Sequence, residues 1–72
     1  MRDIKTITID APDIKGRKRI TYKRGADDFF YLKNIQTDDG MEIKYIDGVG
    51  RIDYSELMAM FRGRDNYSVT FN

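Results

Sequence analysis

The sequence contains no cysteine and no histidine among its 72 residues. The chain therefore cannot form a disulfide, a thiolate or imidazole metal site, or a nucleophile–histidine catalytic system. Catalysis would have to use carboxylates, lysine, arginine and tyrosine, and so short a chain has little room for the pocket that such a site needs. We therefore expect a protein that is not an enzyme and that holds no metal or cofactor. A small metal-independent ribonuclease is the less favoured alternative.

Long apolar stretches are absent as well. No segment approaches the roughly 18 apolar residues of a membrane-spanning helix, and the start of the chain lacks the apolar region of a signal peptide. The lack of cysteine fits a reducing compartment. The sequence thus predicts a single cytoplasmic domain, residues 1–72, with no membrane contact. Because a core of this size is thin, a homodimer that hides further apolar surface stays an open alternative.

Alternating apolar residues predict the first two strands. Ile7 and Ile9 share one face of a strand over residues 5–9. Residues 10–16 contain the only proline and a glycine, so we expect a loop there. In the strand that follows, residues 17–23, Ile20 and Tyr22 face the core.

The rest of the chain reads as two more strands, a helix and a final strand. Residues 29–36 carry aromatic side chains on both faces, which predicts burial on both sides or a bulge. A turn at residues 37–40 leads to a short strand with Met41, Ile43 and Tyr45 on one face. Residues 66–71 alternate again and form the last strand.

A helix near residues 54–62 is predicted by its apolar stripe and its ends. Tyr54, Leu57, Met58 and Phe61 are spaced to share one face, which must pack on the sheet because so short a helix is unstable alone. Asp53 and Glu56 have the spacing of a capping box. The cap, the turn signals and the hydrophobic periods together predict the order β-β-β-β-α-β.

The predicted fold class is α+β, mainly β. It is a small five-stranded twisted sheet or a half-barrel similar to SH3-like barrels, which also place a helical turn between their fourth and fifth strands. This resemblance concerns architecture and implies no function.

Residues 45–56 resemble the calcium-binding loop of an EF-hand, with Gly50, Asp53 and Glu56 at matching places. Tyr45 and Val49, however, stand where two carboxylates are expected. The segment before them alternates like a strand, so the entering helix is missing. We therefore interpret the segment as a turn followed by a helix cap. The Asp pairs at 27–28 and 38–39 are interpreted as turn residues in the same way.

The net charge of +1 hides a strong asymmetry. Residues 1–26 hold eight Lys/Arg against three Asp, whereas residues 27–72 hold five Lys/Arg against nine Asp/Glu. The strand phase places Arg17, Arg19 and Lys23 on the face opposite the core, as a basic ladder. The candidate binding residues are the cations of this predicted hairpin: Lys15, Arg17, Lys18, Arg19, Lys23 and Arg24.

Two kinds of partner fit such a basic hairpin. The first interpretation is a small protein-interaction or inhibitor module, of the type found in phages and mobile elements, because a dipolar surface suits a partner with complementary patches. The alternative is a nucleic-acid-binding module that uses the Arg17/Arg19/Lys23 ladder with nearby aromatic residues. The low net charge favours the first. An edge strand protected by its charges would explain the same pattern without any partner.

Overall fold

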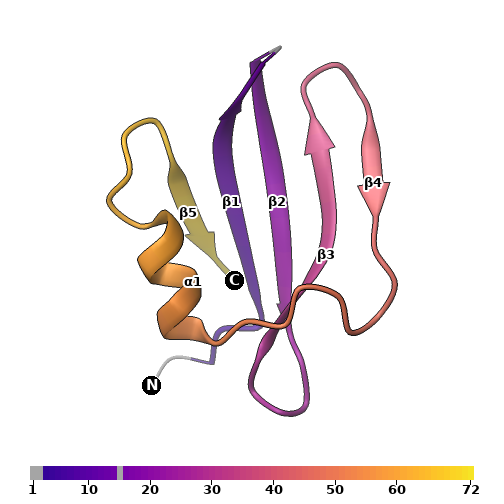
Figure 1. Cartoon of the computed structure of the whole chain (residues 1–72), viewed down its shortest axis with the longest axis vertical. Helices are drawn as coiled ribbons and strands as arrows, with labels where there is room; N and C mark the ends of the chain where they lie inside the picture. Colours follow the sequence, from indigo (N-terminus) through magenta and orange to yellow (C-terminus); the bar gives the residue numbers. More distant parts are fainter. Residues whose placement is uncertain (1–2, 15) are drawn as a thin grey trace.

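The chain forms one antiparallel sheet of five strands with a short helix against one face (Figure 1). The computed structural model describes residues 3–14 and 16–72. The elements are β1 (Thr6–Asp13), β2 (Gly16–Arg24), β3 (Phe30–Thr37), β4 (Glu42–Lys44), α1 (Tyr54–Phe61) and β5 (Ser68–Phe71). Their order across the sheet is β4-β3-β2-β1-β5. The mainly β fold class is thus confirmed, as a five-stranded sheet with the helix between the fourth and fifth strands.

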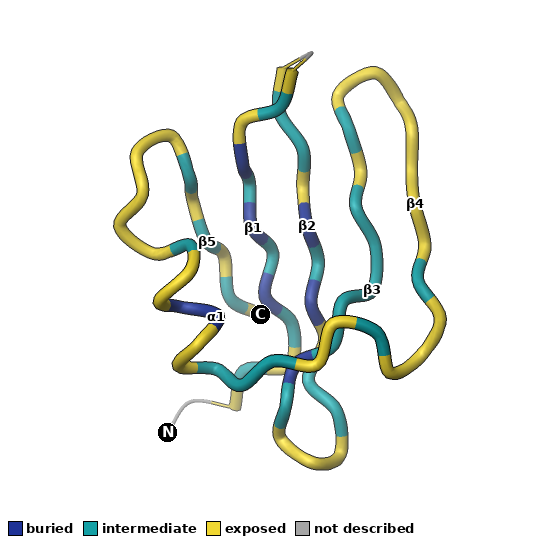
Figure 2. The backbone as a smooth tube through the Cα atoms, in the orientation of Figure 1, coloured by how far each residue is buried: buried dark blue, intermediate teal, exposed yellow. Residues whose placement is uncertain are grey.

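The core lies between α1 and the sheet face that we call the inner face. Period-2 alternation in β1 and β2 sends every second side chain to this face, and β1 and β2 pair so that Ile9 lies opposite Ile20. The buried side chains are Ile7, Ile9, Ala11, Ile20, Tyr22, Phe30, Leu57 and Met58. Figure 2 shows this burial on β1, β2 and the middle of α1, while β4 is exposed throughout. The core is therefore off-centre, beneath the helix and away from β4.

β3 contains a bulge that changes the phase of its side chains. Opposite Thr21 and Tyr22, the pairing register slips by one residue, and Lys33 is the extra residue. Phe30 and Leu32 before the bulge and Ile35 after it consequently all pack against the core. Of the two explanations that the sequence left open, burial on both faces or a bulge, the structure has the bulge.

The prediction of a loop over residues 10–16 was wrong. β1 runs on to Asp13 and β2 begins at Gly16, so only residues 14 and 15 separate the two paired strands. Pro12 is tolerated because β5 pairs with β1 only as far as Asp10. Beyond that residue β1 is a sheet edge, where a missing N–H costs no hydrogen bond.

The helix begins and ends as its sequence predicts. The Asp53 side chain accepts a hydrogen bond from the Glu56 amide at 2.9 Å, which satisfies one of the amides that a helix start leaves unpaired. After α1, Gly63 has a φ of +83°, the left-handed conformation that ends many helices. Leu57 and Met58 are buried, whereas Met60 is 44% exposed.

The segment between β4 and α1 crosses the lower part of the inner face (Figure 1). Ile52 exchanges both backbone hydrogen bonds with Phe30, and the Leu32 amide donates to the Val49 carbonyl at 2.9 Å. Gly50 packs directly on Leu32, where an added Cβ would lie 2.9 Å from the Leu32 Cβ. This segment covers the end of β3 that the helix does not reach.

Candidate anion-binding site

The face of the sheet away from α1, which we call the outer face, is lined by polar side chains. The strand registers place residues of neighbouring strands in rows across it. One row is Thr70, Thr8, Thr21, Asn34 and Lys44, and the next is Ser68, Asp10, Arg19, Gln36 and Glu42. Lys23 and Tyr31 form the last pair toward the turn between β2 and β3. All ten residues of these two rows are half-buried or exposed, and α1 packs on the other face.

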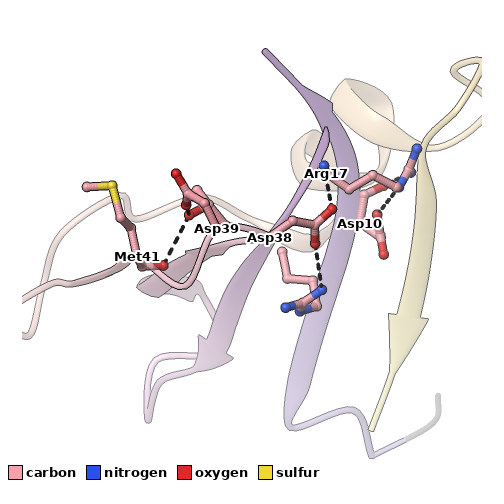
Figure 3. Close-up of polar contacts among 7 residues, drawn as sticks. Asp10, Arg17, Asp38, Asp39 and Met41 are labelled. Carbon is pink, nitrogen blue, oxygen red and sulfur yellow. Dashed lines mark hydrogen bonds and ion pairs between the residues drawn. The ribbon is translucent and has the colours of Figure 1, made fainter. Parts of the chain in front are cut away.

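At the tip of the β1–β2 hairpin, the basic ladder is tied to the protein itself (Figure 3). The Arg17 guanidinium donates to the Asp10 carboxylate and to the Asn66 carbonyl, and the Arg17 amide donates to Asp38 at 2.8 Å. The second oxygen of Asp38 lies 3.7 Å from Arg19. Arg17 thus joins β1, β2, the turn before β4 and the segment before β5. In this structure its guanidinium is bonded to partners within the chain.

The other candidate residues of the hairpin are scattered. Lys18 lies on the inner face, opposite Ala11 and Thr37. Lys15 lies outside the described residues. Of the predicted ladder, the structure leaves Lys23 exposed, with no ion-pair partner within 4 Å among residues 3–14 and 16–72.

Lys23 borders a hollow at the end of β2 and β3, where the turn after β2 meets the turn after β4. Its volume is about 530 Å³, and its lining residues are Lys23, Arg24, Gly25, Tyr31, Lys33, Asp47 and Gly48. Arg24 follows Lys23 at the end of β2 and pairs with the buried Phe30, so its side chain starts on the inner face, whereas Lys33 lies at the bulge in β3. Three cationic residues of two neighbouring strands therefore line one opening.

The carboxylates near this opening only partly balance its charge. Lys33 donates to Asp47 at 2.7 Å, which lowers the pKa of that carboxyl group, with smaller contributions from the charges of Lys33 and Lys23. Arg24 donates to Asp3 at 2.6 Å and likewise lowers the pKa of Asp3. Asp47 is 96% exposed and Asp3 is 72% exposed, so both pairs are open to competition from a bound anion. Three cations against two carboxylates leave an excess of one positive charge.

Tyr31 is held rigidly at the rim of the hollow. Its hydroxyl donates to Asp27 at 2.6 Å, which raises the pKa of Tyr31 and lowers that of Asp27. Arg51 also donates to Asp27 at 3.2 Å, and its guanidinium stacks 3.6 Å from the centre of the Phe29 ring. The Tyr31 ring packs on Gly25, where any Cβ would meet it at 2.7 Å. Gly25 is therefore required for this position of the ring.

Lys23 and Arg24 were predicted as binding residues from the sequence, and Tyr31 was considered among the nearby aromatic residues that could stack on bases, but Lys33 was missed. The spacing of apolar residues in β3 contains the signal for Lys33. Phe30 and Leu32 are two residues apart, but Ile35 follows Leu32 after three residues, which indicates one extra residue in the strand. A bulge between them brings Lys33 toward Asp47 and Tyr31 beside Lys23. No group of three or more possible metal ligands is present among the described residues.

In comparisons with protein-family models, with curated proteins and with solved structures, nothing matches this chain. No helix within residues 3–14 and 16–72 is long and apolar enough to cross a membrane. The fold defines the class of the molecule: an open antiparallel sheet with one face packed on a helix and the other polar. Its function must be argued from that polar face and from the hollow at its end.

Proposed function

We propose that the protein is a non-catalytic binding module for single-stranded nucleic acid, with the hollow beside Lys23 and Tyr31 as its anchor point. The observation that carries this proposal is that Lys23, Arg24 and Lys33 line one opening together with the aromatic residue Tyr31. Cations neutralise phosphate, and aromatic rings stack on unpaired bases. The hollow provides both groups within one site.

The polar side chains of the outer face also favour a single-stranded nucleic acid as the ligand. Its rows of Thr, Asn and Gln side chains offer hydrogen bonds to sugars and base edges. An open sheet face with an aromatic residue is a known platform for single strands, whereas duplexes require an element that enters a groove. A strand anchored in the hollow can therefore continue across the outer face toward Arg19.

The number of cations sets the strength of this binding. Lys23, Arg24 and Lys33 can neutralise about three phosphates. A plot of the logarithm of the binding constant against the logarithm of the salt concentration should then have a slope of roughly −2. The acidic residues elsewhere on the chain limit the footprint to this region. The proposal therefore predicts weak, strongly salt-dependent binding.

The test is fluorescence anisotropy of labelled single-stranded DNA and RNA oligonucleotides, titrated with the wild type and two variants. Lys23→Glu reverses the charge beside the hollow, whereas Arg62→Glu makes the same charge change at the end of α1, on the opposite side of the sheet. We expect the first to lose most of its affinity and the second to keep most of it. Equal losses in the two variants would mean that net charge, and not this site, drives binding.

A protein partner is the second candidate, and one observation favours it. Ile14, at the tip of the basic β1–β2 hairpin, is 98% exposed. An exposed aliphatic residue on a hairpin that also carries Arg17, Lys18 and Arg19 is suited to an acidic protein surface with an apolar pocket. An inhibitor or adaptor of this kind would bind through the hairpin tip. Affinity capture of one protein after nuclease treatment, lost in Ile14→Asp and kept in Lys23→Glu, would support it over nucleic acid.

Catalysis is tested in the same samples. A metal-independent ribonuclease would use the Arg, Lys and Tyr side chains of the hollow, and it would shorten the RNA during the titration. We expect the RNA to stay intact without metal ions, as judged by gel electrophoresis.

A further inference from the structure

The two edges of the sheet differ in how they are covered. β5 lies beside α1 and the segment that leads from it, and Tyr54 of the helix lies 6.3 Å from Phe71, ring centre to ring centre. β4 forms the other edge, and none of the described residues packs alongside it in Figure 1. Its free backbone groups are available to pair with another strand.

Hydrogen bonds at the ends of β4 show which groups point outward. The Thr37 amide donates to the Met41 carbonyl at 3.0 Å, and the Tyr45 amide donates to the Lys33 carbonyl at 2.9 Å. Because backbone groups alternate in direction along an antiparallel strand, residues 41, 43 and 45 pair with β3. The N–H and C=O groups of Glu42 and Lys44 therefore point away from the sheet.

The side chains of β4 are arranged for pairing with an identical strand. Glu42 and Lys44 lie on the outer face, in register with Gln36 and Asn34. Ile43 lies on the inner face and is 48% exposed. In an antiparallel pair centred on Ile43, each Glu42 lies opposite a Lys44 of the other strand.

We propose that β4 pairs with β4 of a second copy of this chain, about a two-fold axis at Ile43, so that two sheets join into one. In this register, Glu42 and Lys44 of each copy exchange backbone hydrogen bonds with Lys44 and Glu42 of the other, four bonds in all. The two Ile43 side chains meet in the close, non-hydrogen-bonded position. Both cross-strand charge pairs are attractive.

The alternation of hydrogen bonds excludes most other registers. The outward groups belong to even-numbered residues, so the neighbouring two-fold registers centre on Glu42 or on Lys44. The first places Glu42 opposite Glu42, and the second places Lys44 opposite Lys44, which is repulsive in both cases. The charges of β4 therefore select the register that the apolar side chains also favour.

Edge strands are often short and charged in order to prevent such pairing. A protective edge repels its own copy, whereas β4 carries one charge of each sign in an order that attracts it. Because the strand has three residues, the interface is small and the dimer is weak, with dissociation in the micromolar to millimolar range. The outer faces of the two copies become continuous, but the dimer does not depend on the proposed nucleic-acid site.

The test is sedimentation equilibrium of the whole chain from micromolar to millimolar concentration, without nucleic acid. Lys44→Glu places Glu opposite Glu in both pairs, and Glu42→Lys places Lys opposite Lys. We expect each single variant to raise the dissociation constant about tenfold or more, since two attractive pairs become repulsive. The double swap, E42K with K44E, restores opposite charges and should restore dimerisation.

A mixture of the two single variants provides the decisive control. The Glu42→Lys chain and the Lys44→Glu chain are complementary to each other, so a heterodimer should form although neither dimerises alone. Thermal unfolding of each variant checks that the fold survives, since Glu42 also accepts a hydrogen bond from Asn34 at 2.7 Å. A wild type that stays monomeric at millimolar concentration, or a double swap that stays monomeric, would overturn the proposal. So would single variants that dimerise like the wild type.

Discussion

Lys23 and Tyr31 lie directly opposite each other on β2 and β3, on the outer face of the sheet and at the rim of the same hollow. The bulge at Lys33 establishes this pairing, because it resets the phase of β3 between Tyr31 and Asn34. A cation and an aromatic ring are thereby placed side by side at the open end of the sheet. The proposed nucleic-acid site rests on this relationship.

The ring of Tyr31 should contribute more to binding than its hydroxyl. We predict that Tyr31→Ala weakens binding of a single-stranded oligonucleotide by about 1–3 kcal/mol, the usual contribution of one stacked base. Tyr31→Phe keeps the ring and should bind within about threefold of the wild type. Anisotropy titration at low salt measures both. Equal losses in the two variants would show that the hydroxyl and its bond to Asp27 matter, rather than stacking.

The Asp27–Tyr31 hydrogen bond makes stability depend on pH at both extremes. Tyr31 has a pKa raised above its usual 10.0 in the folded state, so its contribution is present below pH 10 and is lost as the pH rises through the folded pKa. Asp27 has a pKa lowered below its usual 3.8, so its contribution is present above that pH and is lost as the pH falls further.

Asp27→Asn should therefore lower the pKa of Tyr31 and flatten the stability profile below pH 4. Ultraviolet titration of tyrosinate measures the first effect, and denaturation at a series of pH values measures the second. An unchanged tyrosine titration would show that the two side chains are not paired in solution.

Arg17 should matter for stability and not for ligand binding. It bonds to Asp10 and to the Asn66 carbonyl, and so it ties the hairpin to the segment before β5. Arg17→Ala is expected to cost about 1 kcal/mol in the free energy of unfolding, as is usual for a partly exposed charged hydrogen bond. Arg19→Ala is the matched control, because its 3.7 Å contact with Asp38 is an exposed ion pair with little effect.

Urea denaturation compares the two arginine variants, and the oligonucleotide titration checks that both keep most of their affinity. A larger loss of stability in Arg19→Ala than in Arg17→Ala would contradict the structural role given to Arg17.

The docking of α1 supplies a large share of the stability. Leu57 is fully buried against the inner face, and its replacement by Ala should cost about 2–5 kcal/mol. For a small domain this is a large part of the total, so we expect a fall in the unfolding midpoint or partial unfolding at room temperature. Met60→Ala, at the exposed edge of the same helix, should change stability by less than about 0.5 kcal/mol. Thermal unfolding measures both variants. If the two lowered the unfolding midpoint equally, the burial of Leu57 and the exposure of Met60 would be contradicted.

Much of this architecture could be predicted from periodicity. Ile7 and Ile9 in β1, Ile20 and Tyr22 in β2 and the Leu57–Met58 pair in α1 all face the core as their spacing indicates. These elements are local, and one buried face determines the phase of each. The N-cap at Asp53 is equally local, since one side chain meets an amide three residues later.

The features that were not predicted concern residues whose surroundings depend on pairing between strands. Pro12 looked like a loop residue because the sequence does not reveal that β5 ends its pairing at Asp10. The contact of Arg17 with Asp10 was not predicted, because residues 10–16 were expected to form a loop and not part of an extended hairpin. Lys33 joined the site through a bulge whose position depends on the partner strand. In each case the neighbouring strand, and not the local sequence, determines the surroundings of the side chain.

The most direct measurement is a nuclear magnetic resonance titration of the isotope-labelled chain with a short single-stranded oligonucleotide. The account predicts that the largest amide shifts fall around the hollow, at Lys23, Arg24, Tyr31, Lys33 and Asp47, with smaller shifts along the outer face toward Arg19. Shifts confined to α1 or to the hairpin tip at Ile14, or no shifts at low salt, would contradict it.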